Sequence, residues 1–184
     1  MESYITKPLP VTRPLKRDYP LSLVVALLLT LASVAGLLAP HTLYPTEELR
    51  YSFVSNDVVN LALGLPLLLG ALALTRRGRT RRGRTRRGKL LGLLFWPGAL
   101  FYVTYNYIAY AVAMPLMWQF VLYLALVGLS AWAILRLLKG IDGAAVQARL
   151  QGCVAERFGA GVLMGFGVLF FLRAVAEFFD GAAG

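Results

Sequence analysis

The sequence contains very few residues of the two types that most often hold metal ions. Its 184 residues include one cysteine, Cys153, and one histidine, His41. A single cysteine excludes an intrachain disulfide and a cysteine cluster for a metal. With only one histidine as well, zinc and haem sites of the usual kinds are not expected. The sequence therefore predicts no cofactor and no metal site.

Charged residues are also scarce. They make up 15% of the chain, whereas hydrophobic residues make up 58%, and the mean hydropathy is +0.65. Soluble domains have about 25% charged and about 45–50% apolar residues. A soluble fold of this length has too little interior to bury that excess. The composition therefore indicates a single integral membrane domain over residues 1–184.

Recognisable catalytic motifs are missing from the sequence. It contains no GxSxG, HExxH or Walker A motif, and no GxGxxG on a strand-to-helix turn. An enzyme is therefore not expected. A membrane-embedded enzyme remains the weakest of the function classes that the sequence leaves open.

Five hydrophobic segments are candidates to cross a bilayer, which takes ~20 mostly apolar residues in a helix. The fifth is the weakest, because Arg173 and Glu177 lie inside it. The first also resembles a signal peptide with a small-residue site at Ser33-Val34-Ala35, but apolar sequence continues past that site, which favours a retained span. The predicted fold is all-α, a polytopic transmembrane helix bundle. Its spans are residues 21–39, 54–74, 90–113, 115–135 and 158–179.

The basic residues lie on one side of this topology. With five spans, the tail of residues 1–20, the loop of residues 75–89 and the segment after the fourth span share a side. These regions hold all of the 19 basic residues except Arg50 and Arg173. The positive-inside rule then places the amino terminus in the cytoplasm of a multi-pass cell-membrane protein, of the prokaryotic inner or plasma-membrane kind, and the carboxyl terminus outside.

The loop of residues 75–89 reads TRRGRTRRGRTRRGK, three copies of one five-residue unit. By itself it resembles an Arg/Gly-rich tract that neutralises nucleic-acid phosphates. Between two spans it is better explained as a flexible orientation signal that contacts anionic lipid headgroups, so nucleic acid is not an expected partner. The predicted headgroup contacts are Arg76, Arg77, Arg79, Arg81, Arg82, Arg84, Arg86, Arg87 and Lys89.

Residues 141–157 alternate apolar and polar positions with helical spacing. The pattern fits an amphipathic helix on the cytoplasmic membrane surface, and equally an ordinary connecting helix. Cys153 in this segment lies close to the membrane, where cysteines are either palmitoylated or packed.

Polar side chains recur in one half of the predicted bundle. Counting helical rise from the basic loop puts Asp57 and Asn60 in the extracytoplasmic half, and similar counts place polar residues of the other spans at the same depth. Asp57 and Arg173 are the opposite charges most worth pairing. The predicted cluster, as a ligand site or as packing, consists of Asp57, Asn60, Tyr105, Asn106, Tyr110, Gln119, Tyr123, Arg173 and Glu177.

Three function classes follow. The first is a small membrane protein for assembly, scaffolding or ligand sensing, in which the tyrosines form an ordinary aromatic belt and the amides join helices. The second is a transporter or channel component, with Pro66 and Pro97 breaking two helices near mid-membrane. The third is the membrane enzyme. Small-residue spacings such as Ala32-x-x-x-Gly36 also fit packing against a second copy or other membrane subunits, without identifying either.

Overall fold

The structure is a computed structural model that describes residues 10–76 and 84–150, together with residues 164, 165 and 168. The chain divides into two compact units, residues 1–142 and 143–184, where the composition had indicated one domain. The second unit is described mainly at the short helix α7 (Gly143–Leu150), which covers the first half of the predicted amphipathic segment.

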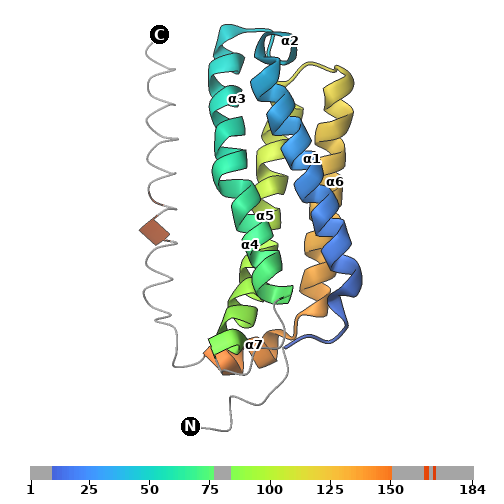
Figure 1. Ribbon diagram of the computed structural model, residues 1–184, viewed down its shortest axis with the longest axis vertical. Helices are drawn as coiled ribbons and strands as arrows, with labels where there is room; N and C mark the ends of the chain where they lie inside the picture. Colours follow the sequence, from blue (N-terminus) through green and yellow to red (C-terminus); the bar gives the residue numbers. More distant parts are fainter. Residues whose placement is uncertain (1–9, 77–83, 151–163, 166–167, 169–184) are drawn as a thin grey trace. The chain divides into compact units, whose positions relative to one another are not determined.

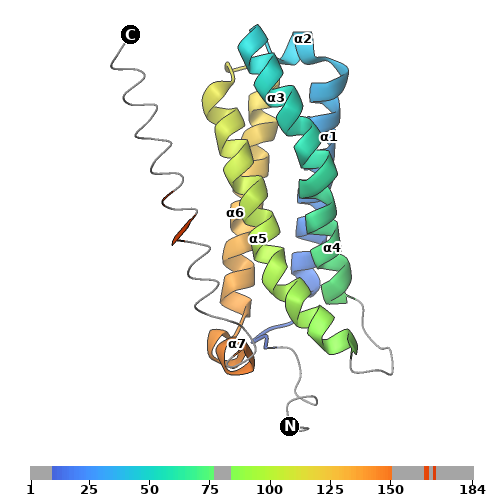
Figure 2. The same cartoon turned by 90° about the vertical axis from the view of Figure 1, so that its left-hand side faces the viewer.

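The first unit is an antiparallel bundle of four rods (Figures 1 and 2). The first rod is α1 (Asp18–Leu38), preceded by the short turn η2 (Leu15–Arg17). After α2 (Pro40–Leu43), the second rod runs as α3 (Glu47–Val59), the π-helical segment η3 (Asn60–Gly64) and α4 (Leu65–Arg76). The third and fourth rods are α5 (Arg84–Ala113) and α6 (Trp118–Gly140), and α5 packs against both α4 and α6.

The rods pack through a regular spacing of buried residues. On α5, the buried positions follow one another at alternating steps of three and four residues: Leu93, Trp96, Leu100, Val103, Tyr107, Tyr110 and Met114. On α6 the same alternation gives Gln119, Tyr123, Leu126, Ser130, Ala133, Leu137 and Gly140. This spacing is typical of helices that pack nearly antiparallel in a bundle. It brings polar and apolar residues alike into the interior.

The π-helical segment keeps both halves of the second rod facing the interior. Before it, Asp57 and Asn60 are buried, and after it Leu68 and Thr75 are buried. A π-helical turn inserts an extra residue into an α-helix and so shifts its phase. Pro66 therefore lies in a continuous helix, and α5 also continues through Pro97. The prediction that these prolines break the helices is wrong.

Several predicted boundaries shift for local reasons. The second rod begins at Glu47 instead of residue 54, because Thr46 caps its first turn by accepting a hydrogen bond from the Leu49 N–H. Helix α5 begins at Arg84, so residues 84–89 of the predicted loop are helical. The fourth rod covers residues 118–140 instead of 115–135. The fifth predicted span lies almost wholly outside the described residues.

The exterior of the bundle is apolar, as Leu27, Leu31, Phe101, Val112 and Val121 illustrate with more than half of their surface exposed. Three of the described helical stretches are long and apolar enough to cross a membrane: Leu15–Leu38, Glu47–Arg76 and Trp118–Gly140. Helix α5 is long, but it carries the tyrosines and Asn106 and falls outside this set. The all-α fold is confirmed for the described residues, while five spans and their orientation stay predictions.

Candidate functional site

Asp57 is the centre of a buried polar cluster in the half of the bundle that carries α2. Its side chain comes from α3 and is 1% exposed. The Tyr44 hydroxyl donates to Oδ2 at 2.5 Å, and the Tyr110 hydroxyl of α5 donates to Oδ1 at 2.8 Å. Both carboxylate oxygens are therefore occupied by tyrosine hydroxyls from two different parts of the fold.

Helix α1 makes room for this carboxylate with a glycine. An ideal Cβ placed on Gly36 would overlap Asp57 Oδ2 and the Tyr44 hydroxyl oxygen. One turn earlier, the Ser33 hydroxyl lies 3.3 Å from the hydroxyl of Tyr107, and both residues are fully buried. The small-residue spacing of α1 therefore serves contact within this chain, between α1 and the second rod.

Tyr44 reaches the cluster from the connector of residues 39–46, outside the long helices. It is fully buried. Burial, followed by its hydrogen bond to Asp57, raises the pKa of the Tyr44 hydroxyl above its ordinary value. Since both effects favour the neutral form, Tyr44 acts as a hydrogen-bond donor at any physiological pH.

Aromatic rings enclose the carboxylate. Tyr110 contacts Phe53 at a centroid distance of 4.5 Å, Tyr107 at 5.0 Å and Tyr123 at 5.2 Å. Tyr44 lies 5.9 Å from Phe53 on the same side of the bundle. We call Asp57 with these five rings (Tyr44, Phe53, Tyr107, Tyr110 and Tyr123) the Asp57 cluster. Its members fill one another's space.

A second polar group lies beside the π-helical segment. Asn60 Oδ1 accepts hydrogen bonds from Asn106 Nδ2 at 2.7 Å and from the Tyr102 hydroxyl at 2.9 Å. Asn56 Nδ2 donates to Asn106 Oδ1 at 3.3 Å. The Asn60 amide nitrogen is buried and has no hydrogen-bond partner among the described residues. Nearby, Leu63, Gly64, Leu67 and Tyr102 line an apolar cavity of about 310 Å³.

Gln119 begins the buried stripe of α6, one turn before Tyr123. It is 2% exposed, and its Nε2 donates to the Leu43 carbonyl at 3.4 Å, next to Tyr44. Its Oε1 is buried and has no donor within the described part of the chain. Gln119 therefore adds an unsatisfied hydrogen-bond acceptor at the α2 end.

A different arrangement closes the opposite end of the bundle. Asp18 is fully buried, and its carboxylate pairs with Arg13 at 2.9 Å and with Arg136 Nε at 3.0 Å. Arg13 also donates to the Arg136 carbonyl. The adjacent Thr12 N–H donates to the Gly140 carbonyl at 2.9 Å, so the amino-terminal segment is fastened to the end of α6.

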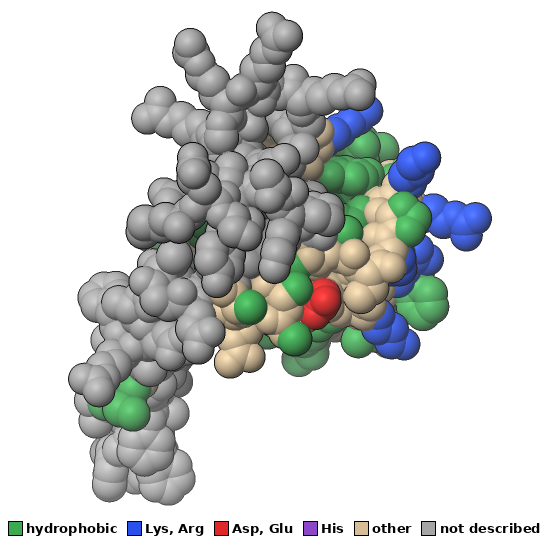
Figure 3. Space-filling view, turned by 90° about the horizontal axis from the view of Figure 1, so that it is seen from below, with side chains coloured by type: hydrophobic (Ala, Val, Ile, Leu, Met, Phe, Trp, Pro, Cys, Tyr) green, Lys and Arg blue, Asp and Glu red, His purple; other side chains and the backbone are tan. Residues whose placement is uncertain are grey.

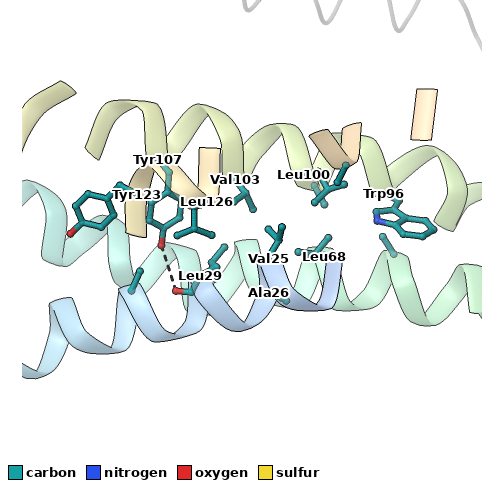
Figure 4. Close-up of a cluster of buried hydrophobic side chains, with 14 of the residues drawn as sticks. Val25, Ala26, Leu29, Leu68, Trp96, Leu100, Val103, Tyr107, Tyr123 and Leu126 are labelled. Carbon is teal, nitrogen blue, oxygen red and sulfur yellow. Dashed lines mark hydrogen bonds between the residues drawn. The ribbon is translucent and has the colours of Figure 1, made fainter. Parts of the chain in front are cut away.

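An apolar layer lies between the two ends. Val25, Leu68, Leu100, Val103 and Leu126 are all fully buried there, between Trp96 on one side and Tyr107 and Tyr123 on the other (Figure 4). Trp96 belongs to the Asp18 side, where its Nε1 donates to the Ser22 hydroxyl at 2.9 Å. The layer separates the polar groups of the two ends by packed hydrocarbon.

The structure brings six of the nine predicted cluster residues into the interior. Tyr105 is a correction, because it is 65% exposed on the outside of α5. The buried stripe of α5 is centred on Tyr107, almost half a turn away from it. Arg173 and Glu177 lie outside the described residues, as does any pairing of Arg173 with Asp57. The six are Asp57, Asn60, Asn106, Tyr110, Gln119 and Tyr123.

The predicted lipid-contact residues are only partly described. Arg76 is the exposed last residue of α4. Arg84, Arg86, Arg87 and Lys89 belong to the first turns of α5, while Arg77, Arg79, Arg81 and Arg82 lie outside the described residues. Seen from the end opposite α2, Lys and Arg side chains gather on one part of the surface (Figure 3).

Sequence reasoning missed Tyr44, Tyr107 and Asp18. Tyr107 was detectable, because the alternating three- and four-residue spacing from Leu93 to Met114 passes through it. Asp18 is the one acid beside Lys16 and Arg17 in the amino-terminal tail, which was a weaker signal. Tyr44 gave none, since a residue in a connector has no periodicity to place it.

The chemistry of the Asp57 cluster is that of an anion with hydroxyl donors and aromatic faces. In the described ranges, no three His, Cys, Asp or Glu side chains come together as a metal site. Comparison of the chain with protein-family models, with curated proteins and with solved structures finds no match.

Proposed function

We propose that this chain is a small multi-pass integral membrane protein that senses a ligand from the extracytoplasmic side. The observation that carries the proposal is Asp57, an ionisable group buried in the bundle without a cationic partner among the described residues. An intramembrane ionisable residue costs about 2.5–3.5 kcal/mol even on the lenient insertion scale, so it marks a functional site by default.

Membrane insertion is supported by the apolar exterior and by the three apolar helices. Orientation is supported by the distribution of charge over the first unit. Arg13, Lys16, Arg17, Arg136 and Lys139 lie near the end opposite α2, whereas Arg50 lies at the α2 end. The positive-inside rule then puts the α2 end outside, with anionic headgroups as partners of the basic end.

Sensing or assembly fits the bundle better than conduction. A conducting path needs polar groups or water across the membrane, whereas here the apolar layer around Leu100 and Leu126 interrupts them. The proposed protein therefore binds on one side of this layer without passing a solute through it. A transporter remains the alternative if the bundle opens.

Topology labelling tests the membrane part of the proposal. The single Cys153 is first replaced by serine, and new cysteines are placed at exposed Tyr51 and exposed Lys16. A membrane-impermeant thiol reagent applied to intact cells should label the residue 51 variant and spare the residue 16 variant. Labelling of the residue 16 variant in intact cells would refute the orientation.

A flux assay in reconstituted vesicles tests the alternative. The sensing proposal expects no solute flux above protein-free vesicles across a panel of ions and small metabolites. Reproducible flux that is lost in Asp57→Asn would replace sensing by transport.

A further inference from the structure

The Asp57 cluster has acceptors and aromatic faces but no positive charge among the described residues. The nearest base on its own helix is Arg50, two turns toward α2, where Nη1 faces Glu47 Oε1 at 4.0 Å. Neither of the two hydroxyls that reach Asp57 is a cation. A carboxylate in a low-dielectric interior is stabilised far better by a positive charge than by neutral donors.

The surrounding rings favour the same kind of partner. A tyrosine or phenylalanine face attracts a cation placed within about 6 Å of the ring centre, and the attraction is strongest where water is excluded. Tyr44, Tyr107, Tyr110 and Tyr123 are at most 2% exposed. Five rings around one carboxylate form a site for an organic cation, because such a cation has an apolar body as well as a charge.

Gln119 narrows the chemistry of the cation. Its Oε1 is an acceptor without a donor, beside the Leu43 carbonyl at the α2 end of the cluster. A quaternary ammonium has no N–H to offer, so it would leave this oxygen unsatisfied. A protonated primary amine or a guanidinium group would satisfy it.

We propose that the Asp57 cluster binds a small aryl or alkyl cation carrying N–H donors, with its charge on Asp57 and an N–H on Gln119 Oε1. The proposal rests on the ligand-sensing function above and names its ligand class. Tyr44 holds the place of the cation in the closed state. When the connector of residues 39–46 moves away, the Oδ2 position that Tyr44 occupies becomes available to the ligand.

The test uses the full chain, purified in detergent, with benzylammonium as the probe. Two compounds of similar shape serve as controls: benzyl alcohol, which has no charge, and trimethylbenzylammonium, which has no N–H. Benzylammonium should raise the melting temperature saturably, trimethylbenzylammonium should bind roughly tenfold more weakly, and benzyl alcohol should have no effect. A melting temperature that benzylammonium leaves unchanged overturns the proposal.

Three variants locate the effect. Asp57→Asn should abolish the benzylammonium shift, and Gln119→Met should weaken the affinity about tenfold, as expected for one hydrogen bond to a charged group. Tyr44→Phe removes the competing hydroxyl and should tighten binding. Asp18→Asn is the matched control: it alters the other buried aspartate and should keep the shift.

Each outcome has a distinct meaning. Equal shifts in the wild type and in Asp57→Asn would place the amine elsewhere and overturn the proposal. If Asp57→Asn fails to fold, the opposite effects expected for Tyr44→Phe and Gln119→Met still decide, and weaker binding in Tyr44→Phe contradicts it. The topology labelling is independent, so a failed amine test leaves the membrane orientation standing, and failed labelling removes the extracytoplasmic access.

Discussion

Two buried aspartates lie at opposite ends of the same helix bundle, and their surroundings differ in charge. Asp18 is paired with two arginines, Arg13 and Arg136. Asp57 receives only tyrosine hydroxyls from the described residues. Both carboxylates are at most 1% exposed, so burial is the same and only the partners differ.

The difference separates a structural ion pair from a candidate binding site. At Asp18 the charges are satisfied within the chain, and the ion pairs fasten the amino-terminal segment to α6. At Asp57 the charge is left to neutral donors, which cost less to displace than a guanidinium. We therefore expect substitutions at the Asp18 end to affect stability alone, and substitutions at the Asp57 end to affect stability and binding.

The largest effect is expected from Asp18→Asn. Removing one partner of a buried ion pair leaves the other charges uncompensated, which costs about 3–5 kcal/mol. The two arginine side chains are each 30% exposed, so we expect a loss of about 3 kcal/mol in the free energy of unfolding. Denaturant titration in mixed micelles measures it, with the exposed neighbour Arg17→Gln as a control that should stay within about 0.5 kcal/mol. A loss no larger than the control's would show that Asp18 is not a lock.

A smaller effect is expected from Tyr110→Phe. It removes one hydroxyl donor from the Asp57 carboxylate, and a hydrogen bond to a charged group contributes about 1.5–3 kcal/mol. The same titration should show a loss of about 2 kcal/mol. Tyr105→Phe, on the exposed face of α5, is the matched control and should be nearly neutral. Equal effects of the two substitutions would contradict the burial of the Tyr110 hydroxyl.

Glycine substitutions test the fit of α1 against Asp57. Gly36→Ala should destabilise by about 1–2 kcal/mol, since its Cβ would overlap Asp57 and Tyr44. Gly70→Ala has nothing within 4 Å of the new Cβ and lies inside α4, so it should be neutral or stabilising by up to about 1 kcal/mol. Thermal unfolding of both variants checks the opposite signs. A stabilising Gly36→Ala would mean that α1 and Asp57 are farther apart.

The smallest effect is expected at the basic end. Deleting residues 75–84 removes two of the three five-residue units and leaves TRRGK between α4 and α5. Because positive charges near span ends set orientation and many remain, the topology should be unchanged. The thiol labelling pattern of the residue 51 and residue 16 variants provides the readout, and inverted labelling would show that the repeat itself orients the chain.

Much of the candidate site was predictable from the sequence. Counts of helical rise put Asp57, Asn60, Asn106, Tyr110, Gln119 and Tyr123 at similar depth, and all six are buried. Depth follows from 1.5 Å per residue and needs no knowledge of neighbours. Direction is harder, and Tyr105 shows why: polar residues were assumed to define the inner face of α5, whereas the bulky stripe through Trp96, Val103 and Tyr107 defines it.

The sequence by itself determined the all-α class, the apolar helices and the one-sided distribution of basic residues, because hydropathy and charge act residue by residue along the chain. Only the tertiary structure decided which acid is neutralised. Arg13, Asp18 and Arg136 meet across more than one hundred residues, and Tyr44 reaches Asp57 from a connector without periodicity. Charge pairing depends on distances of a few ångströms between separate helices, and these distances exist only once the bundle has packed.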